Sequence, residues 1–271
     1  MSKKRISLCV LLYGDHLDLA DRCLRSIWER LSEGRDYLYD IRIGLNEIAP
    51  PTRALVEWFV KNTLEYHQIP VITYDCPVNA CKYPLIRKMV LEDTRSPAEF
   101  VMWFDDDSYL DGEKGWWGEV LSHAAAADMI GKKYFQGLRG SQWSWIVNQP
   151  WYNPAVGKPP TKRGRHSFVF ATGGWWVVST KVFVKHNWPC AELKHCGGDS
   201  MLGELLRHQG YVLREFETGV RINADKRGRH SKATPRGESL NRKLLGTSFT
   251  SGDKDTSHQV FDCVRTTYHC E

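Results

Sequence analysis

The sequence predicts an α/β protein whose mostly parallel sheet is flanked by helices. Over residues 5–110, apolar runs of strand length alternate with stretches whose apolar residues recur at helical spacing. This alternation is typical of βαβ units. No internal repeat or clear linker divides the 271 residues, so we expect one domain with an elaborated second half.

The first half contains four predicted strands, which are the apolar runs at residues 6–12, 39–45, 70–74 and 100–104. Helices are predicted from Asp18 or Asp21 to Gly34, from Pro50 onwards, and over residues 80–91. In such a sheet the loops that follow the strands gather along one edge. We therefore expect the following side chains to be neighbours: Tyr13, Gly14, Asp15, Asn46, Asp75 and the acidic residues after the fourth strand.

The second half alternates less regularly. A helix is predicted over residues 115–129, one or two strands over 134–147, and a long polar loop over 151–165. Residues 167–179 are expected to form a bent strand or a strand pair around Gly173 and Gly174, where the missing side chains let a ligand or another backbone come close. A helix from about Asp199 to Gln209 and a strand over 211–216 complete the prediction.

The composition is that of a soluble globular protein, with 42% hydrophobic and 25% charged residues. No stretch of 18 apolar residues predicts a membrane span. The basic and then apolar start lacks a small-residue cleavage site and is better explained as a first strand than as a signal peptide. The eight cysteines are dispersed without a Cys-x-x-Cys pair, which favours reduced thiols. We expect a cytoplasmic protein.

Basic residues are concentrated in two places, although the net charge is only +5. Residues 221–243 carry eight Lys and Arg against Asp225 and Glu238, and residues 158–166 form a second basic run. Such clusters indicate a polyanionic partner or the phosphates of a nucleotide. The alternative is a solvated loop that binds nothing.

Three adjacent carboxylates, Asp105, Asp106 and Asp107, follow the apolar run at 100–104. They repel one another, and burying them without a counter-charge is unfavourable. Mg²⁺ and Mn²⁺ prefer oxygen ligands, often one or two carboxylates together with substrate phosphates. The triplet therefore predicts a divalent cation at the end of a buried strand. The alternative is that these residues cap a helix or form a turn.

Two motifs, in this order, resemble those of the GT-A class of glycosyltransferases, particularly the inverting family-two type. Asp105-Asp106-Asp107 resembles the Asp-x-Asp motif, and Gly198-Asp199 stands where the family usually has Glu-Asp or Asp-Asp. The order of strands and helices resembles that of the family over roughly residues 5–220. Gly198 stands in place of the first acidic residue of the second motif, which leaves Asp199 as the candidate base. The resemblance implies a GT-A-like fold and transfer of a sugar from a nucleotide diphosphate sugar, most often a UDP-sugar.

The resemblance also implies roles for individual residues. Asp105 and Asp107 would hold Mn²⁺ or Mg²⁺, with Asp106 facing the ribose or a metal-bound water, and Asp199 would be the general base. The alternative for Asp199 is a plain helix cap. The donor would be bound by Tyr13 and Gly14 at the base, Asp75 at a uracil imide, and Lys82 and Arg87 at the diphosphate; the alternative for the last two is surface charge. A late histidine, His230, would join the metal site.

The acceptor is predicted from charge and aromatic residues. Trp175 or Trp176 would stack on a sugar or base, and Arg227 and Arg229 would hold phosphates. Our hypothesis is DNA carrying a hydroxymethylated pyrimidine, as in bacteriophage DNA-modifying glycosyltransferases. The alternatives are a cell-surface saccharide precursor as acceptor, a metal-dependent nucleotidyltransferase, and a non-catalytic DNA-binding protein.

For the domain organisation we expect a glycosyltransferase domain over residues 1–246 and a tail over 247–271. Within the domain, residues 1–110 would bind the nucleotide, 111–220 the acceptor, and 221–246 would form a basic segment.

Overall fold

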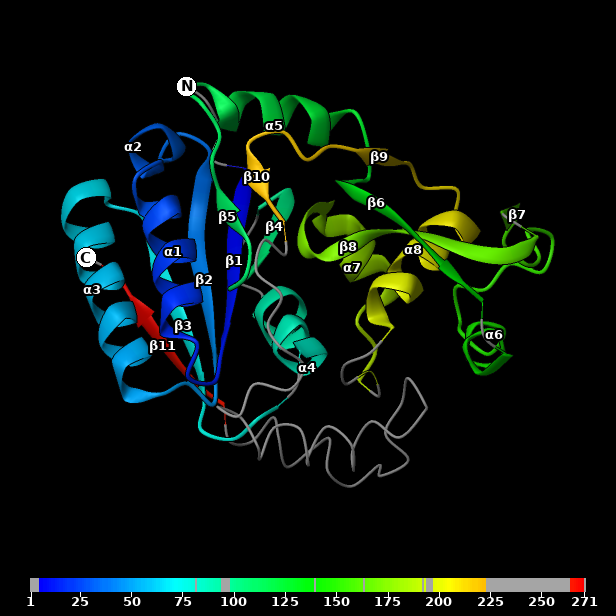
Figure 1. Ribbon diagram of the computed structural model, residues 1–271, viewed down its shortest axis with the longest axis horizontal. Helices are drawn as coiled ribbons and strands as arrows, with labels where there is room; N and C mark the ends of the chain where they lie inside the picture. The colour runs from blue at the N-terminus through cyan, green and yellow to red at the C-terminus, as the bar shows by residue number, and fades with distance from the viewer. Residues whose placement is uncertain are drawn as a thin grey trace.

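The computed structural model describes residues 5–80, 82–93, 98–138, 140–162, 164–191, 193, 197–222 and 264–270. Within these ranges, nine strands form one mixed sheet with helices on both faces (Figure 1). The sheet strands are β1 Ile6–Tyr13, β2 Leu38–Asn46, β3 Val71–Cys76, β4 Phe100–Asp105, β6 Met129–Gly137, β7 Thr161–Lys162, β8 Arg165–Ser179, β9 Leu213–Glu215 and β11 Arg265–His269. Two short strands, β5 Tyr109–Leu110 and β10 Val220–Arg221, pair with each other.

The strand order is β11-β3-β2-β1-β4-β8-β6-β9, with β7 paired to β8 beside this path. Strands β3, β2, β1 and β4 are parallel, as predicted. β8 runs antiparallel to β4 and β6, and β11 runs antiparallel to β3. The predicted mostly parallel sheet is confirmed. Strand β8 joins β4, the last of the four parallel strands, to β6 of the second half.

The helices divide between the two faces of the sheet. They are α1 Leu17–Trp28, α2 Leu31–Gly34, α3 Pro50–His67, α4 Lys82–Arg87, the π-helix η1 Lys88–Glu92, α5 Trp116–Ala125, α6 Gly140–Ile146, α7 Thr180–His186 and α8 Gly198–His208. Alternate residues of β1 serve both faces: Leu8 and Val10 pack in the core under α1, α3 and α5, whereas Cys9 and Leu11 pack in the core under α4, α7 and α8. A strand buried on both faces must be apolar throughout, which explains the uninterrupted runs in the sequence.

The loops at the carboxyl edge meet as predicted. The Gly14 amide donates to the Asn46 carbonyl at 3.2 Å, and the Glu47 amide donates to the Cys76 carbonyl at 2.8 Å. Gly14 has a φ of +64°, a conformation that glycine adopts without strain. The ends of β1, β2 and β3 are therefore joined directly.

The structure differs from the prediction in three places. The helix predicted over residues 115–129 ends at Ala125, because Met129 and Ile130 instead pair with Val178 and Val177 as buried strand residues. The second part of the stretch predicted as strand is α6, which buries Ile146 fully. The weakly patterned end of the chain contributes β11 to the sheet edge.

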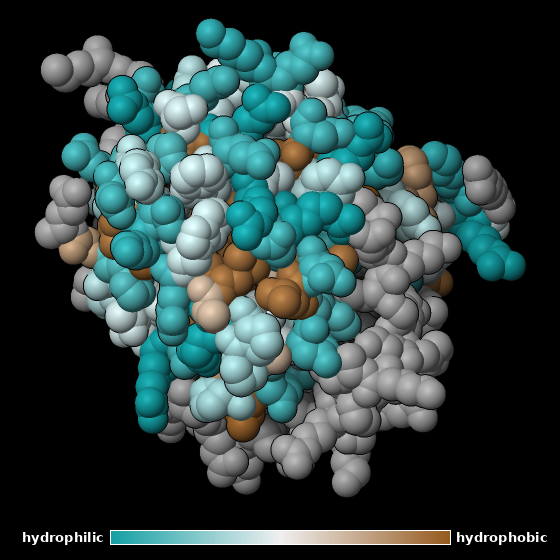
Figure 2. Space-filling model, turned by 60° about the vertical axis from the view of Figure 1, so that its left-hand side comes forward, coloured by the Kyte–Doolittle hydropathy of each residue, from teal (hydrophilic) through white to brown (hydrophobic). Residues whose placement is uncertain are grey.

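The surface drawn in Figure 2 is mostly hydrophilic, and its hydrophobic residues form small separate groups. None of the helices in the described ranges combines the length and the hydrophobicity that crossing a bilayer requires.

A buried ion pair in β2 generates the first prediction. The side chains of Asp40 and Arg42 are 3.0 Å apart and both residues are 2% exposed. Removing the cation alone leaves a buried carboxylate, so Arg42→Met should lower the free energy of unfolding by about 3–5 kcal/mol in urea denaturation. The double variant Asp40→Leu/Arg42→Met should recover most of this loss. Equal destabilisation of the single and double variants would contradict the prediction.

Candidate active site

The acidic triplet divides into one structural and two site carboxylates. Asp106 is 1% exposed, and its Oδ2 accepts the Tyr13 amide at 3.3 Å. This bond ties the triplet to the end of the neighbouring strand β1. Asp105 and Asp107 are partly exposed on either side of it. The structure therefore brings Tyr13 and the triplet together, and it directs Asp106 inwards.

Lys82 lies between the triplet and the glycine turn of β8. Its ammonium donates to Asp105 Oδ2 at 2.9 Å and to the Gly173 carbonyl at 2.7 Å. The other Asp105 oxygen accepts the indole N–H of Trp103 at 2.9 Å. Burial alone would lower the pKa of Lys82, but the charges of Asp105, Asp199 and Asp107 raise it above its usual value. Lys82 is thus a fixed cation at this edge of the sheet.

Asp199 reaches the same place from the first turn of α8. The Tyr83 hydroxyl donates to Asp199 Oδ1 at 2.7 Å. A Cβ atom on Gly173 would lie 2.5 Å from Asp199 Oδ2 and 2.8 Å from the Lys82 ammonium, so glycine at position 173 allows the two charged groups to approach the β8 backbone. Asp105, Lys82, Gly173 and Asp199 therefore form one cluster, although they are distant in the sequence.

A second glycine, Gly198, precedes Asp199 and packs against Tyr83. A Cβ atom on Gly198 would lie 2.0 Å from the Tyr83 ring. The ring thus occupies the space that an acidic side chain would need at this position. Here the Tyr83 phenol contacts Asp199, and the first turn of α8 carries a single carboxylate.

Asp107 carries negative charge that the cluster does not fully balance. Burial and then the charge of Asp105 raise its pKa to about 7, although Lys82 and hydrogen bonds from the backbone and Ser108 act in the opposite direction. A further cation beside Asp107 would relieve this repulsion.

The carboxylates can hold a divalent metal together with a phosphate ligand. Asp105 and Asp107 provide the hard oxygen donors that Mg²⁺ and Mn²⁺ prefer. No group of three His, Cys, Asp or Glu side chains within the described ranges is arranged to hold a metal by itself. The arrangement therefore fits an ion that takes one or two carboxylates and completes its shell with substrate phosphates.

Hydrogen bonds of Asn79 and Ala80 connect the segment after β3 to the ends of β1 and β2. Asn79 donates to the Tyr13 hydroxyl at 3.1 Å and accepts from Asn46 at 3.2 Å. Asn46 in turn accepts the Ala80 amide at 2.8 Å. These bonds fix the Tyr13 ring at the carboxyl edge of the sheet.

Asp75 lies at the end of β3 and is bound by Arg53 of α3. The two guanidinium nitrogens donate to its two oxygens at 3.0 and 2.8 Å. Each carboxylate oxygen has a further lone pair, so this bidentate pair orients Asp75 and leaves it able to accept another donor.

Three residues proposed for the site from the sequence lie elsewhere. Arg87 donates to Glu92, Asn187 and the Pro189 carbonyl, and it joins α4 to the end of α7. Trp175 and Trp176 are 0% and 1% exposed, because both rings pack in the core. Neither ring has a face for an acceptor, so we omit both from the site. His230, Arg227 and Arg229 lie outside the described residues.

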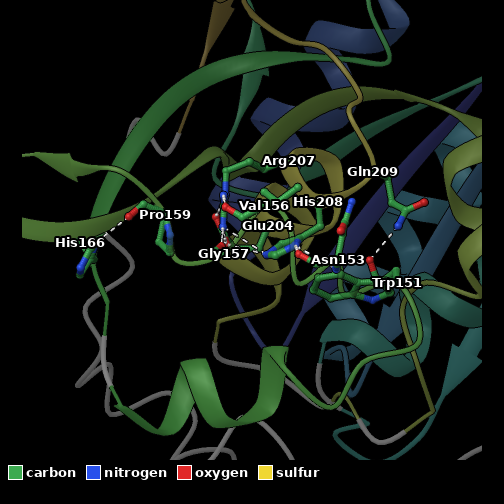
Figure 3. Close-up of polar contacts among 10 residues, drawn as sticks. All are labelled: Trp151, Asn153, Val156, Gly157, Pro159, His166, Glu204, Arg207, His208 and Gln209. Carbon is green, nitrogen blue, oxygen red and sulfur yellow. Dashed lines mark hydrogen bonds and ion pairs between the residues drawn. The ribbon is translucent and has the colours of Figure 1, made fainter.

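The far end of α8 is fixed to the long polar loop (Figure 3). Arg207 donates to Glu204 at 2.6 Å and to the Gly157 carbonyl at 2.7 Å, and Gln209 donates to the Trp151 carbonyl at 2.7 Å. His208 Nδ1 lies 3.1 Å from the Asn153 carbonyl. Burial and then the charge of Arg207 lower the pKa of His208. These contacts hold the helix whose first turn carries Asp199.

The fold can now be compared with solved structures. A mannosyltransferase from Pyrobaculum calidifontis, solved in complex with GDP-Man and Mn²⁺, matches with a TM-score of 0.55 at 13% identity, over 83% of this chain and 58% of that one. The chain shares the fold of this mannosyltransferase. S. aureus TarS matches with a TM-score of 0.47 at 14% identity, over 95% of this chain and 42% of that one. HddC from Yersinia pseudotuberculosis matches with a TM-score of 0.41 at 8% identity, over 81% of this chain and 92% of that one. No protein-family model and no curated protein matches the sequence.

Sequence reasoning missed Tyr83, Asn79 and Arg53. Tyr83 and Asn79 lie in the segment after β3, and Arg53 lies in the first turn of α3, which are positions that follow a parallel strand. The predicted strands were enough to place these three residues near the carboxyl edge. Their hydrogen-bond partners could not be predicted, because each partner comes from another loop at the same edge.

The close fit of Gly198 against Tyr83 generates a prediction. Gly198→Ala should lower the melting temperature by several degrees, because the methyl group would overlap the Tyr83 ring. Gly140→Ala is the matched control: Gly140 also begins a helix, and a Cβ there meets nothing within 4 Å. In a double-mutant cycle with Tyr83→Ala, the effect of Gly198→Ala should largely disappear. An effect that persists without the Tyr83 ring would refute this explanation.

The raised pKa of Asp107 predicts a pH-dependent stability. The pKa of this carboxyl group is about 7 in the folded protein and 3.8 in the unfolded chain. Between pH 3.8 and 7 the folded protein therefore binds a proton that the unfolded chain has lost, and the stability falls as the pH rises through this range. Asp107→Asn should therefore raise the melting temperature of the metal-free protein at pH 8 and change it little at pH 4. Melting curves across this range measure the difference. A variant that is less stable than the wild type at pH 8 would contradict the assignment.

Proposed function

We propose that this protein is a metal-dependent glycosyltransferase that moves a sugar from a nucleotide diphosphate sugar to an acceptor hydroxyl, with inversion at the anomeric carbon. The observation that carries the proposal is the cluster of Asp105, Lys82, Gly173 and Asp199 at the carboxyl edge of the sheet. In this cluster Asp105 offers a carboxylate for a metal, Lys82 is a fixed cation, and Asp199 adds a carboxylate from α8. The glycosyltransferase fold supports the same activity.

The nucleoside would bind along the ends of β1 and β3. The Tyr13 ring, held by Asn79, would stack on the base, and Gly14 would allow close approach of the backbone. Asp75, oriented by Arg53, would accept the imide N–H of uracil, so we favour a UDP-sugar.

The diphosphate would lie between Lys82 and the triplet. Asp105 and Asp107 would hold Mn²⁺ or Mg²⁺, as the Pyrobaculum mannosyltransferase was solved with Mn²⁺. The metal would neutralise the charge that develops on the leaving diphosphate. Lys82 would supply a second positive charge beside the metal, because its ammonium already lies against Asp105.

The transfer step would use Asp199 as general base. The acceptor oxygen attacks the anomeric carbon, the bond from that carbon to the diphosphate oxygen breaks, and the acceptor proton passes to the Asp199 carboxylate. The Tyr83 hydroxyl holds Oδ1, so Oδ2 is the oxygen proposed to take the proton. A single displacement of this kind inverts the anomeric centre.

For the acceptor we propose DNA that carries a hydroxymethylated pyrimidine, as in bacteriophage DNA modification, with the reaction in the cytoplasm. A base turned out of the helix would present its hydroxyl to Asp199. The support is electrostatic: basic residues are concentrated at residues 158–166 and 221–243.

The donor half is tested by thermal shift with a panel of nucleotide sugars, each with Mn²⁺ and with chelator. One nucleotide sugar should raise the melting temperature in the presence of metal. Asp107→Ala should abolish this shift, because the metal loses a ligand. Asp199→Asn should retain the shift and lower turnover, measured as release of the nucleoside diphosphate, by about 10²–10⁴-fold.

Two outcomes would refute the proposal. One is the absence of a metal-dependent shift with every donor. The other is full turnover in Asp199→Asn, which would show that Asp199 is not the general base. Lys61→Ala, an exposed position on α3, serves as the control and should match the wild type in both measurements.

A further inference from the structure

Strands β6 and β8 continue past the end of β4 as a two-stranded arm. β4 pairs with β8 only as far as Phe104 opposite Trp175. Beyond this point residues 133–137 of β6 pair with residues 167–171 of β8, and β7 pairs with Arg165 and His166. Because β8 is antiparallel to β4, the arm leaves the sheet at the carboxyl edge, where Asp105 ends β4. Figure 1 shows the arm extending away from α1 and α3, with β7 near its far end.

The arm has one covered face and one open face. Phe168 and Phe170 are buried against α8, where Gly203 contacts Phe170. Residues alternate between faces along a strand, and directly paired residues share a face. The face away from Phe170 therefore carries the pair Phe135 and Val169. Phe135 is 43% exposed, which is unusual for a phenylalanine in the middle of a paired strand.

Cations surround the exposed ring. The Lys162 ammonium lies 3.1 Å from the centroid of Phe135, and Lys162 pairs directly with Arg165 across β7 and β8. In the part of the chain that the structure describes, no carboxylate forms an ion pair with Lys162 or Arg165. By contrast, Lys132, at the base of the arm, pairs with Glu217 at 2.6 Å. The cations at the far end of the arm are thus available to an external anion.

The sequence around the arm contains no acidic residue. Residues 129–191 include nine Lys and Arg and neither Asp nor Glu. Over the whole chain the counts are close, at 37 basic and 32 acidic residues, so this stretch is locally and strongly positive. A surface with uncompensated positive charge and an exposed aromatic ring is complementary to a phosphate backbone that carries bases.

We propose that the open face of the arm, formed by Phe135, Lys162 and Arg165, binds the acceptor as a nucleic-acid strand. A base stacks on the Phe135 ring in place of the Lys162 ammonium, and successive phosphates contact Lys162 and Arg165. This inference rests on the proposed function, whose acceptor it assigns to a surface outside the catalytic cluster. Nucleic acid fits this face better than a simple polyanion because the aromatic ring offers a stacking partner as well as charge.

The arm connects this face to the catalytic cluster. Arg165 lies near the far end of the arm, eight residues before Gly173 on β8, and the register between β8 and β6 shifts between Ala171 and Trp176. Ser200, next to Asp199, donates to Gln136 at 3.1 Å, and Gln136 pairs with Phe168 on the covered face of the arm. The first turn of α8 is thus bonded to the covered face, and a nucleic-acid strand on the open face would pass around the edge of the arm to reach Asp199.

The test is a fluorescence anisotropy titration of the full chain with labelled single-stranded DNA of about 20 nucleotides, at about 50 and 200 mM salt. Phe135→Ala should weaken binding about tenfold at both salt concentrations. Lys162→Ala/Arg165→Ala should weaken binding at low salt and reduce the slope of log affinity against log salt by about 1.4, which corresponds to two phosphate contacts.

Controls separate this inference from the proposed function. Lys61→Ala/Lys114→Ala removes two exposed cations outside the arm and should bind DNA like the wild type. All arm variants should retain the metal-dependent thermal shift with the donor, because the arm does not contact the donor site. If the donor shift is present but the wild type binds no DNA at low salt, the inference fails and the donor assignment stands. The inference also fails if inorganic polyphosphate competes fully and Phe135→Ala binds DNA like the wild type, since the face would then recognise charge alone.

Discussion

Repulsion among carboxylates at the end of β4 is the constraint around which this site is built. Asp105, Asp106 and Asp107 are adjacent, and the structure separates their tasks: Asp106 turns inward to the Tyr13 amide, while Lys82 is held against Asp105. The Lys82 ammonium also binds the Gly173 carbonyl, so one cation joins the central sheet to the turn of β8. Burial and the charge of Asp105 raise the pKa of Asp107 to about 7, although the charge of Lys82 acts in the opposite direction.

Two glycines convert this electrostatic arrangement into a defined geometry. Gly173 lets Asp199 and Lys82 approach the β8 backbone, and Gly198 makes room for the ring of Tyr83. A side chain at either position would separate groups that now lie in contact. The anchoring of α8 through Arg207 and Gln209 fixes the other end of the helix that carries Asp199. The position of the proposed base thus depends on packing as much as on charge.

The sequence was informative where a residue's role follows from its own strand. The apolar run at 100–104 with its three Asp residues, and the turn residues after β1, β2 and β3, located the carboxyl edge correctly because parallel strands share that edge. Asp199 was predicted from the glycine pair and acid at a helix start, which form a local pattern, and the structure places it beside Tyr83 and Lys82.

The sequence was uninformative where a role depends on a distant partner. Trp175 and Trp176 resemble ligand-stacking residues in the sequence, but neighbouring strands and helices bury both of them. Tyr83 was missed because its contact with Gly198 links segments more than a hundred residues apart. The strand–helix order of residues 129–146 was misjudged for the same reason, since pairing with β8 decides it.

The measurement that tests the central claim most directly is a crystal structure of the protein with UDP and Mn²⁺. The account predicts a metal ion bound to Asp107 or Asp105, the diphosphate beside Lys82, and the uracil near Tyr13 and Asp75. Asp199 should remain in contact with Tyr83 on the opposite side of the site, within reach of an acceptor. A nucleotide bound elsewhere on the sheet, with Lys82 and the triplet unchanged, would contradict the account.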